Sequence, residues 1–513
     1  MKIVDAFKGV VAPAVLALAP AVVAPVASAQ PLAVRVEIAA APFTPLQSHA
    51  TAHTDTGNLF FGGLSGMGLH ILFNNPNQEV AFPGPAYNRN IYLYDDSTET
   101  LFTGTTDHLS DTVKEALLVA NIPHVQYDDT LFLYGGYGIT LDGTDWTTRD
   151  TITSIDLTMV EAALRAGTPI PEAAFSVTQS SFAQTTGALI IKMGDRFALI
   201  GGHIFTGDYA QVGTPTFDQV YIGEAYIFDR NVSMTTPVQT LISPLASELH
   251  RRDMNASPAV LPAQGGGVDF GFVINGGVFN GFIPWWSPVT YCDGDVDPVE
   301  ELYAEQWMNQ YEGPRASFYS EANNENRFVL FGGISSHTWN GSNFTFDFNT
   351  PWTAEITENR MVNGIWQGVQ RMNDFTGQMV TVTDNILGQM PLPVSNTDLV
   401  INPLLPTNVN GQVLLDETPA NEFLLGRFYG GLNAAMPGNE VPTYASSTIT
   451  EIYVVYGVRG DITRDGVVNA ADLSELLGSW GTSSTVPDLN LDGIVNAADL
   501  ATLLGNWGND TPG

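Results

Sequence analysis

The chain has little cysteine, few basic residues and, beyond its N-terminus, no long hydrophobic run. One cysteine, Cys292, stands among 513 residues, so an internal disulfide is excluded and the chain must be stable without one. Lys and Arg total 19 and Asp and Glu total 54, which gives a formal net charge of −35. A chain this acidic repels nucleic acid and anionic membranes, and we exclude both as partners. Acidic side chains suit divalent cations better.

The sequence also lacks the short motifs that identify many active sites. It contains no Gly-rich phosphate loop, no HExxH and no GxSxG. None of its histidines stands at a metal-ligand spacing from another; they are His49, His53, His70, His108, His124, His203, His250 and His337. His49 and His53 precede a predicted strand, and a solvated or structural role is favoured for them. We therefore nominate no catalytic residue, although glycosidase carboxylates come from distant positions and leave no local signature.

The first 29 residues have the pattern of a signal peptide. Lys2 and Lys8 give a positive start, an apolar run extends from Val10 to Val26, and Ala27-Ser28-Ala29 fits a small-residue cleavage site. A membrane anchor is the alternative, but three prolines interrupt the run. We expect cleavage and a secreted, extracellular mature protein. No other window holds about 18 apolar residues, so no membrane span is expected after removal of the signal.

The body, residues 30–457, repeats one device, a short apolar run that ends in Gly-Gly. Such runs, bounded by Gly, Asn and Asp, predict buried strands, and the glycine pair fits a close approach of two backbones after the strand. The copies are NLFFGG at 58–63, LFLYGG at 131–136, RFALIGG at 196–202, FGFVINGG at 270–277, RFVLFGG at 327–333 and LLGRFYGG at 424–431. A second device, an aromatic run ending at or near Asp, gives IYLYDD at 91–96, AYIFDR at 225–230 and FTFDF at 344–348.

Repetition on this scale indicates a repeat architecture. Through the apolar-Gly-Gly strand and the later Tyr-containing strand, the body resembles the kelch-type β-propeller, and it is similar to secreted kelch-like proteins of environmental bacteria. That resemblance implies a mainly β fold with six or seven blades and supplies no known activity. The longest gap between glycine pairs has room for a further blade near GQMVTVTD at 377–384. The inserted segment DLTMVEAALRAG at 156–167 has the composition and spacing of a helix.

The tail, residues 458–513, contains one 21-residue segment twice, at 461–481 and 488–508, with 14 identical positions. Each copy places side-chain oxygens at loop positions 1, 3 and 5, glycine at 6, an amide at 9 and a carboxylate at 12. This is the ligand spacing of a calcium loop, in which position 7 contributes a backbone carbonyl and position 9 acts through water. We therefore predict two Ca²⁺ sites. Their ligands are Asp461, Thr463, Asp465, Val467, Asn469 and Asp472 in the first loop, and Asp488, Asn490, Asp492, Ile494, Asn496 and Asp499 in the second.

A short helix is predicted after each loop. The apolar face of the first is Leu473, Leu476, Leu477 and Trp480, and that of the second is Leu500, Leu503, Leu504 and Trp507. The pair of units resembles a type I dockerin module, apart from Thr463, where Asp or Asn is usual. That resemblance implies docking onto a cohesin-like partner through loop positions 10 and 11, which are Ala470, Ala471, Ala497 and Ala498. A self-contained tail stabilised by calcium is the equal alternative.

The insertion PWWSPVTYCDGDVDPVEE at 284–301 is the most unusual stretch of the body. Trp285 and Trp286 offer flat apolar faces that suit sugar rings or aromatic partners, although packing within the loop is the favoured interpretation.

Two classes of function follow from the sequence as a whole. The favoured one is a secreted, non-catalytic propeller that binds a glycan or a protein and carries a dockerin-like docking tail. The alternative is an extracellular polysaccharide-degrading enzyme, a glycosyl hydrolase or lyase, because dockerins most often accompany such enzymes.

Two further expectations concern the ends of the body. Val34–Ile38 and Ile452–Tyr456 are the first and last predicted strands of the mature body, and we predict that they share one sheet, since this leaves no unpaired edge. Only residues 457–460 separate the last strand from the first calcium ligand. This linker is too short for a flexible tether, so we predict that the tail rests against the body.

Overall fold

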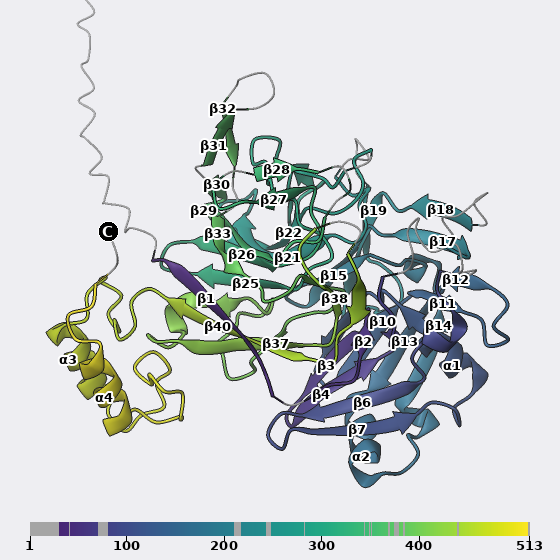
Figure 1. Ribbon diagram of the computed structural model, residues 1–513, viewed down its shortest axis with the longest axis horizontal. Helices are drawn as coiled ribbons and strands as arrows, with labels where there is room; N and C mark the ends of the chain where they lie inside the picture. Colours follow the sequence, from purple (N-terminus) through teal and green to yellow (C-terminus); the bar gives the residue numbers. More distant parts are fainter. Residues whose placement is uncertain are drawn as a thin grey trace, which may run out of the picture.

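The computed structural model describes residues 30–40, 42–69, 81–209, 217–242, 248–281, 283–342, 344–347, 349, 351–367, 370–373, 379–382, 385–438 and 441–510. The predicted signal peptide and His70 lie outside these residues. The fold is mainly β, with strands β1 to β40 and helices α1 to α4 (Figure 1). None of these helices has the length and apolar character needed to cross a membrane.

Six sheets follow one another along the chain, and we number them sheet 1 to sheet 6. Sheet 1 is β3-β4-β6-β7 (Ala50–Thr54, Gly57–Phe61, Asn90–Asp95, Thr100–Thr105). Sheet 2 is β9-β10-β13-β14 (His124–Tyr127, Thr130–Tyr134, Thr151–Asp156, Phe175–Gln179). Sheet 3 is β15-β16-β19-β20 (Leu189–Met193, Arg196–Ile200, Glu224–Asp229, Gln239–Ile242). All three sheets are antiparallel, and a tight turn joins the first two strands of each, whereas an insertion separates the second strand from the third.

The remaining three sheets repeat this arrangement with variations. Sheet 4 is β21-β22-β23-β24 (Asn255–Pro262, Val268–Asn275, Val289–Cys292, Val299–Glu300). Sheet 5 is β36-β25-β26-β29-β30 (Val413–Leu414, Arg315–Ser320, Glu325–Phe331, Glu355–Val362, Ile365–Gln367), and β33 (Asn385–Gln389) also pairs with β29. Sheet 6 is β35-β37-β40-β1 (Val400–Ile401, Phe423–Tyr429, Ile449–Tyr456, Leu32–Ile38).

Insertions between these strands form smaller sheets. A five-stranded sheet contains β8, β11, β12, β17 and β18 (Val119–Ala120, Tyr137–Ile139, Trp146–Thr148, His203–Gly207, Phe217–Tyr221). Two- and three-stranded sheets pair β2 with β5 (Leu46–Gln47, Leu64–Ser65), β27 with β28 (His337–Trp339, Phe344–Phe346), and β34 with β38 and β39 (Val394–Ser395, Leu432–Ala434, Thr443–Ala445). β31 (Gln370–Asn373) pairs with β32 (Met379–Val382), so the segment near 377–384, where the sequence leaves room for a further blade, contributes a strand to a two-stranded ribbon.

Each predicted apolar-Gly-Gly run forms an interior strand of its sheet, namely β4, β10, β16, β22, β26 and β37. The glycine pair that follows has positive φ at both residues. A Cβ on Gly135 would lie 2.3 Å from the carbonyl oxygen of Ala183, on the segment that leads into sheet 3. The N–H of Gly136 donates to the carbonyl oxygen of Thr185 on the same segment at 2.9 Å. The predicted close approach of two backbones is confirmed, and it joins each sheet to the next.

A cycle of backbone hydrogen bonds also connects the sheets. Its members precede the first strand of each sheet and have φ between 50° and 63°: Ser48, Asn121, Gly187, Asp253, Glu312 and Asn396. Each N–H donates to the carbonyl oxygen of the preceding member, at 2.7 to 3.4 Å, and Ser48 donates to Asn396 at 2.8 Å. The cycle therefore closes from the sixth sheet back to the first. We call these six residues the inner ring.

Apolar side chains fill every junction between neighbouring sheets. Because strand residues alternate between two faces, each sheet contributes to one cluster on either side. Representative pairs are Leu59 with Leu131, Tyr134 with Phe197, Ile200 with Phe272, Leu261 with Phe328, Phe331 with Leu425, and Tyr429 with Phe60. The last pair joins sheet 6 to sheet 1. The core is thus distributed around a closed circuit of sheets.

The two ends of the body meet in sheet 6, as predicted. β1 pairs antiparallel with β40, with Val34 opposite Val454 and Ile38 opposite Thr450. The first strand therefore completes a sheet whose other strands come from the end of the body (Figure 1). Because β1 covers the outer edge of β40, that edge is not left open to other chains.

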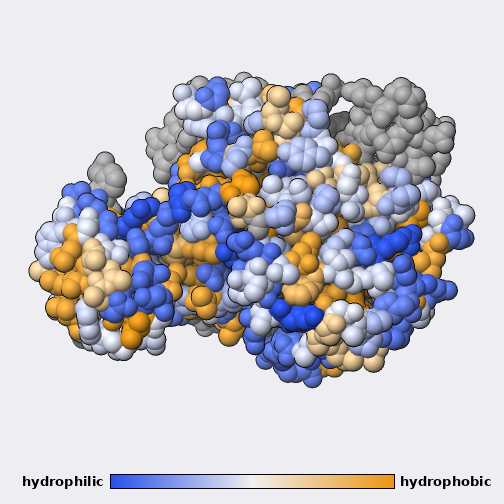
Figure 2. All heavy atoms as spheres, turned by 60° about the horizontal axis from the view of Figure 1, so that its bottom comes forward, coloured by the Kyte–Doolittle hydropathy of each residue, from blue (hydrophilic) through white to orange (hydrophobic). Residues whose placement is uncertain are grey.

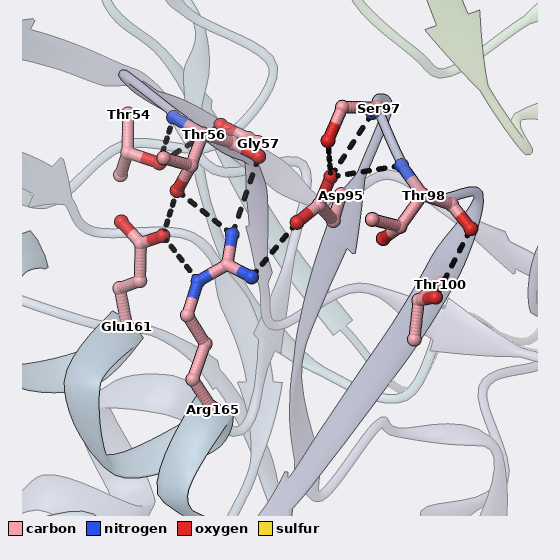
Figure 3. Close-up of polar contacts among 9 residues, drawn as sticks. All are labelled: Thr54, Thr56, Gly57, Asp95, Ser97, Thr98, Thr100, Glu161 and Arg165. Carbon is pink, nitrogen blue, oxygen red and sulfur yellow. Dashed lines mark hydrogen bonds and ion pairs between the residues drawn. The ribbon is translucent and has the colours of Figure 1, made fainter.

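Two helices lie in the first half of the body. α1 (Asp111–Leu117) begins at the N-cap Ser110, and α2 (Leu157–Ala166) begins at the N-cap Asp156 and ends at Gly167 in the left-handed conformation. The second agrees with the predicted helix at 156–167. Arg165 of α2 donates to Asp95 at 2.8 Å, to Glu161 at 2.7 Å and to the Thr56 hydroxyl at 2.7 Å (Figure 3). One arginine thus fixes the helix to two turns of sheet 1.

The tail packs beside sheets 5 and 6 (Figure 1). Arg464 donates to the carbonyl oxygen of Thr418 at 2.7 Å, and its guanidinium lies 4.9 Å from the centre of the Tyr456 ring. Asn421 donates to the carbonyl oxygen of Leu489 at 2.8 Å. Ala420 also belongs to the apolar cluster of the tail. The prediction that the tail rests against the body is confirmed by these contacts.

Candidate calcium sites

The first predicted calcium loop folds around two buried carboxylates. Asp461 is 2% exposed and accepts the N–H groups of Asp465 at 3.1 Å and Gly466 at 2.7 Å. Asp472 is fully buried and accepts the N–H of Thr463 at 2.9 Å and the N–H of Asn469 at 2.7 Å. The first carboxylate thus holds the turn, and the second closes the loop onto the start of the helix.

The second loop repeats these contacts. Asp488 accepts from the N–H groups of Asp492 at 3.2 Å and Gly493 at 2.8 Å. Asp499 accepts from Asn490 at 3.2 Å and Asn496 at 2.8 Å. The duplication predicted from the sequence is therefore also a duplication of geometry, down to the identity of the donor positions.

A capping box begins each helix. Asn469 precedes α3 (Ala470–Gly478) and Asn496 precedes α4 (Ala497–Gly505). The cap side chain accepts from the helix backbone, while the Asp three residues later accepts from the backbone of the cap. This reciprocal arrangement satisfies N–H groups that would otherwise lack partners. Position 12 of each loop therefore acts both in the predicted ligand set and as a helix cap.

The buried carboxylates of the tail have no basic partner. Asp461, Asp472, Asp488 and Asp499 are each at most 3% exposed, and none forms an ion pair with Lys, Arg or His in the described part of the chain. Burial, followed by the charge of Asp472, raises the pKa of Asp461. Buried carboxylates are expected to be paired or to bind a metal. The donor set, which is rich in oxygen and includes the carbonyls of Val467 and Ile494, fits Ca²⁺.

Across the described residues, no group of three or more His, Cys, Asp or Glu side chains converges as a preformed metal centre. In the tail, the third carboxylate of each loop, Asp465 or Asp492, is exposed. Asp465 accepts from the N–H of Val467 at 3.0 Å, and Asp492 accepts from Ile494 at 3.1 Å. Binding of an ion would therefore draw this side chain inward to complete the set.

The predicted apolar faces of the two helices are only partly buried. Leu476 and Leu503 are fully buried, and Leu473 and Leu500 pack against them. The remaining four residues of the predicted apolar faces were expected to be buried with them, and this expectation is wrong. Leu477 is 53% exposed, Trp480 46%, Leu504 52% and Trp507 46%. Each helix is short and contacts the rest of the tail along a single stripe, so only every third or fourth residue reaches the core. Figure 2 shows hydrophobic surface on the tail at the left of the view.

The four predicted docking residues form two pairs, one at the start of each helix of the tail. Ala470 and Ala471 open α3, Ala497 and Ala498 open α4, and all four are exposed. Reciprocal backbone contacts relate the two units: Val468 donates to Asn509 at 2.9 Å, and Val495 donates to Thr482 at 2.8 Å. Each loop thus pairs with the segment that follows the helix of the other unit. Equivalent alanines are presented by both copies.

The two tryptophans predicted for ligand binding are engaged within the protein. Trp285 lies under the guanidinium of Arg251, 4.9 Å from the ring centre, and Trp286 stacks on Trp307 with ring centres 5.9 Å apart. Both side chains are partly buried. The arrangement agrees with the favoured interpretation of loop packing, and a sugar-stacking role stays a prediction.

Sequence inspection missed a polar cluster at the inner ring. Residues from all six sheets line one cavity there, among them His49, Asp253, Glu312, Arg315 and Asp398. No motif marks these positions, since they are separated by tens to hundreds of residues. The one available signal is their place, at the start of the first strand of a sheet or within a few residues before it. The sequence favours a solvated or structural role for His49, whereas this residue is 4% exposed and lines the cavity.

Comparison with known proteins adds little to this description. No protein-family model matches the chain, and no curated protein matches it. Among solved structures, one titled "Structure of YjhT" is similar with a TM-score of 0.42 and 10% sequence identity, covering 78% of this chain and 95% of that one. A likeness this weak carries no argument about function.

Proposed function

We propose that the protein is an exported, non-catalytic binding protein built from a six-bladed β-propeller and a calcium-binding, dockerin-like tail. The six successive sheets, the apolar cluster at each junction and the closed inner ring support six blades rather than seven. In such a ring, each sheet is a blade, and pairing of β1 with β40 joins the ends of the chain within one blade. Kelch-type glycine pairs support the same architecture.

The observation that carries calcium binding is the burial of four carboxylates without basic partners in two equivalent loops. Each of these carboxylates accepts two backbone N–H groups but forms no ion pair, and burying an ion without a counter-charge costs on the order of several kcal/mol. Two ions would remove that penalty and draw Asp465 and Asp492 into their loops. Asp461, Thr463, Asp465, Val467, Asn469 and Asp472 would hold the first ion. Asp488, Asn490, Asp492, Ile494, Asn496 and Asp499 would hold the second.

The tail supports docking because it exposes equivalent apolar residues in both repeats. The paired alanines at the helix starts and the exposed Leu and Trp side chains give a surface that a cohesin-like protein can contact. The blade loops would bind a glycan or a protein. The enzyme alternative gains no support from the pair of carboxyls, Asp253 and Glu312, that lie next to each other in the cavity. Asp253 and Glu312 are in hydrogen-bond contact, whereas glycosidase carboxyls stand about 5 to 9.5 Å apart.

Calorimetric titration of the full-length protein with calcium tests the proposal. The full chain is needed because Ala420 and Thr418 of the body help to enclose the tail. We expect Asp472→Ala and Asp499→Ala each to remove one bound ion, and the double variant to remove two. The first loop should have a higher dissociation constant for calcium than the second. Thr463→Asn should bring the two dissociation constants closer together, because an amide oxygen is a better ligand in that turn.

Thermal unfolding gives a second measure. Calcium at about 100 times its dissociation constant stabilises by about 2.7 kcal/mol per site. The wild-type melting temperature should therefore rise with calcium and return on chelation, and the double variant should lose most of the shift. Asp142→Ala serves as the control, because Asp142 is an exposed residue in the loop between β11 and β12. This variant should keep the full calcium-dependent rise in melting temperature. Equal calcium stoichiometry in wild type and double variant would contradict a calcium role for the loops.

A further inference from the structure

The inner ring surrounds a cavity of about 70 Å³. This volume holds an ion with a few water molecules, since one water needs roughly 10 to 15 Å³ by the same measure. Five of the six ring members carry oxygen-bearing side chains: Ser48, Asn121, Asp253, Glu312 and Asn396. All five line the cavity, and the sixth member, Gly187, carries no side chain. The ring thus brings two carboxyls, two amides and one hydroxyl to the cavity, whose lining also includes Asp398, Asn255 and Thr397.

Contacts within the ring hold these side chains close together. The Asn396 amide donates to Glu312 Oε1 at 2.9 Å and to the Ser48 hydroxyl oxygen at 3.1 Å. Asp253 and Glu312 form a carboxyl–carboxyl contact. Asp253 Oδ1 extends over Gly187, where a Cβ would lie 2.4 Å away. The glycine therefore leaves room for a carboxylate oxygen at the edge of the cavity.

Two polar groups at the cavity have no partner among the described residues. His49 is 4% exposed, and neither of its ring nitrogens makes a hydrogen bond. Asp253 Oδ1 is buried and also lacks a partner. Unsatisfied buried polar groups are uncommon and indicate an unseen water or ion. A histidine with two free nitrogens and a free carboxylate oxygen that line the same cavity indicate that the cavity has a polar occupant.

The basic groups around the cavity are already engaged. Arg315 donates to the Ala256 carbonyl oxygen at 2.7 Å and pairs with Asp398 at 3.3 Å. Arg252 lies 3.7 Å from the other oxygen of Asp253 and within 6 Å of two aromatic rings. His124 accepts from the N–H of Thr51 at 3.2 Å. Asp253 and Glu312, which are consecutive members of the ring, therefore share Arg252.

We propose that this cavity is a binding site for one hard divalent cation, Ca²⁺ in the first instance. Asp253 and Glu312 would be its carboxylate ligands, the Asn121 amide oxygen and the Ser48 hydroxyl would add neutral oxygens, and His49 would accept a hydrogen bond from an ion-bound water. The Asn396 amide oxygen accepts from the Ser395 hydroxyl, so Asn396 would instead position Glu312 and Ser48 through its NH₂ group. Ca²⁺ takes six to eight oxygen ligands in flexible geometry, which four ring positions, with carboxylates that can bind through both oxygens, and a few waters supply. The set has a single imidazole and no thiolate, so it suits Ca²⁺ better than Zn²⁺ or Cu²⁺.

This site is independent of the tail loops, and the test separates the two. The starting protein is the full-length Asp472→Ala/Asp499→Ala variant, whose tail ligands are removed. After treatment with chelator and removal of the chelator, it is titrated with CaCl₂ by calorimetry, and its bound calcium is counted after equilibrium dialysis. We expect one ion per chain. Adding Glu312→Gln should abolish this ion up to about 1 mM calcium, the weak end of the protein range.

Glu355→Gln is the matched control. Glu355 is a buried glutamate of β29 in the same sheet, 4% exposed, and it does not line the cavity. The control should retain one ion per chain. Asp253→Asn provides a second test if Glu312→Gln does not fold. Absence of bound calcium from the starting protein would overturn the proposal, and so would an unchanged stoichiometry in the folded Glu312→Gln or Asp253→Asn protein.

Discussion

At the scale of single residues, Asp95 shows how one carboxylate can hold several turns. It is 5% exposed, accepts from the backbone of Ser97 and Thr98 and pairs with Arg165 at 2.8 Å. The hydrogen bond from the Ser97 hydroxyl is the largest cause of its lowered pKa, and the Arg165 guanidinium adds to it against the opposing effect of burial. Because the folded state holds the charged form, Asp95 stabilises the protein above the unfolded pKa of about 4.

We predict that Asp95→Asn lowers the free energy of unfolding at pH 7 by about 1 to 3 kcal/mol, since charge-assisted hydrogen bonds are lost. The stability advantage of the wild type should shrink as the pH falls below about 4 toward the folded pKa, because the carboxylate then becomes protonated. Melting temperatures of both proteins between pH 7 and pH 3 measure this. Asp128→Asn, which alters a 78%-exposed carboxylate paired with Arg230, should change the stability by less than about 0.5 kcal/mol. A gap between wild type and Asp95→Asn that is independent of pH would contradict the assignment.

At the scale of elements, the glycine pairs decide how one sheet meets the next. Gly135 follows β10 with φ of +60°, and an added Cβ would lie 2.3 to 2.4 Å from the carbonyl oxygens of Ala183 and Thr185. Gly143 has φ of +73° but has nothing within 4 Å of its would-be Cβ. The two positions thus share the backbone requirement and differ only in the contact with the neighbouring sheet.

We predict that Gly143→Ala costs about 1 kcal/mol, the price of a left-handed backbone for alanine. Gly135→Ala should cost several kcal/mol more, because the collision forces sheets 2 and 3 apart. Thermal unfolding of the two single variants gives the comparison, and the difference between them isolates the junction of the sheets. Equal losses in both variants would show that backbone conformation alone explains the glycine.

At the scale of the whole molecule, closure depends on a strand from the far end of the chain. β1 pairs along its full length, from Leu32 opposite Tyr456 to Ile38 opposite Thr450. Val34 and Val36 also pack on the core between sheets 5 and 6. Removal of β1 would expose the edge of β40 and uncover part of that core.

We predict that deletion of residues 30–38 lowers the melting temperature by at least 10 °C and makes the body sensitive to protease, since an edge and an apolar surface are exposed together. Deletion of residues 458–513 should leave a folded body with a smaller loss, because the tail has its own apolar cluster. Limited proteolysis and thermal unfolding of the two truncated proteins decide this. A β1-deleted protein as stable as the tail-deleted one would contradict a closing role for β1.

The sequence by itself determined the features that depend on neighbours along the chain. Apolar runs before Gly-Gly became interior strands, the segment 156–167 became a helix, and the two loops of the tail formed around Asp461 and Asp488. Each of these follows from spacing within about 20 residues.

The tertiary structure alone decided what depends on distant segments. It brought Ser48 beside Asn396, 348 residues away, placed Asp253 against Glu312, and left Leu477 and Trp480 exposed. Side chains that meet only through ring closure leave no local pattern, because their separation along the chain is set by the lengths of whole sheets.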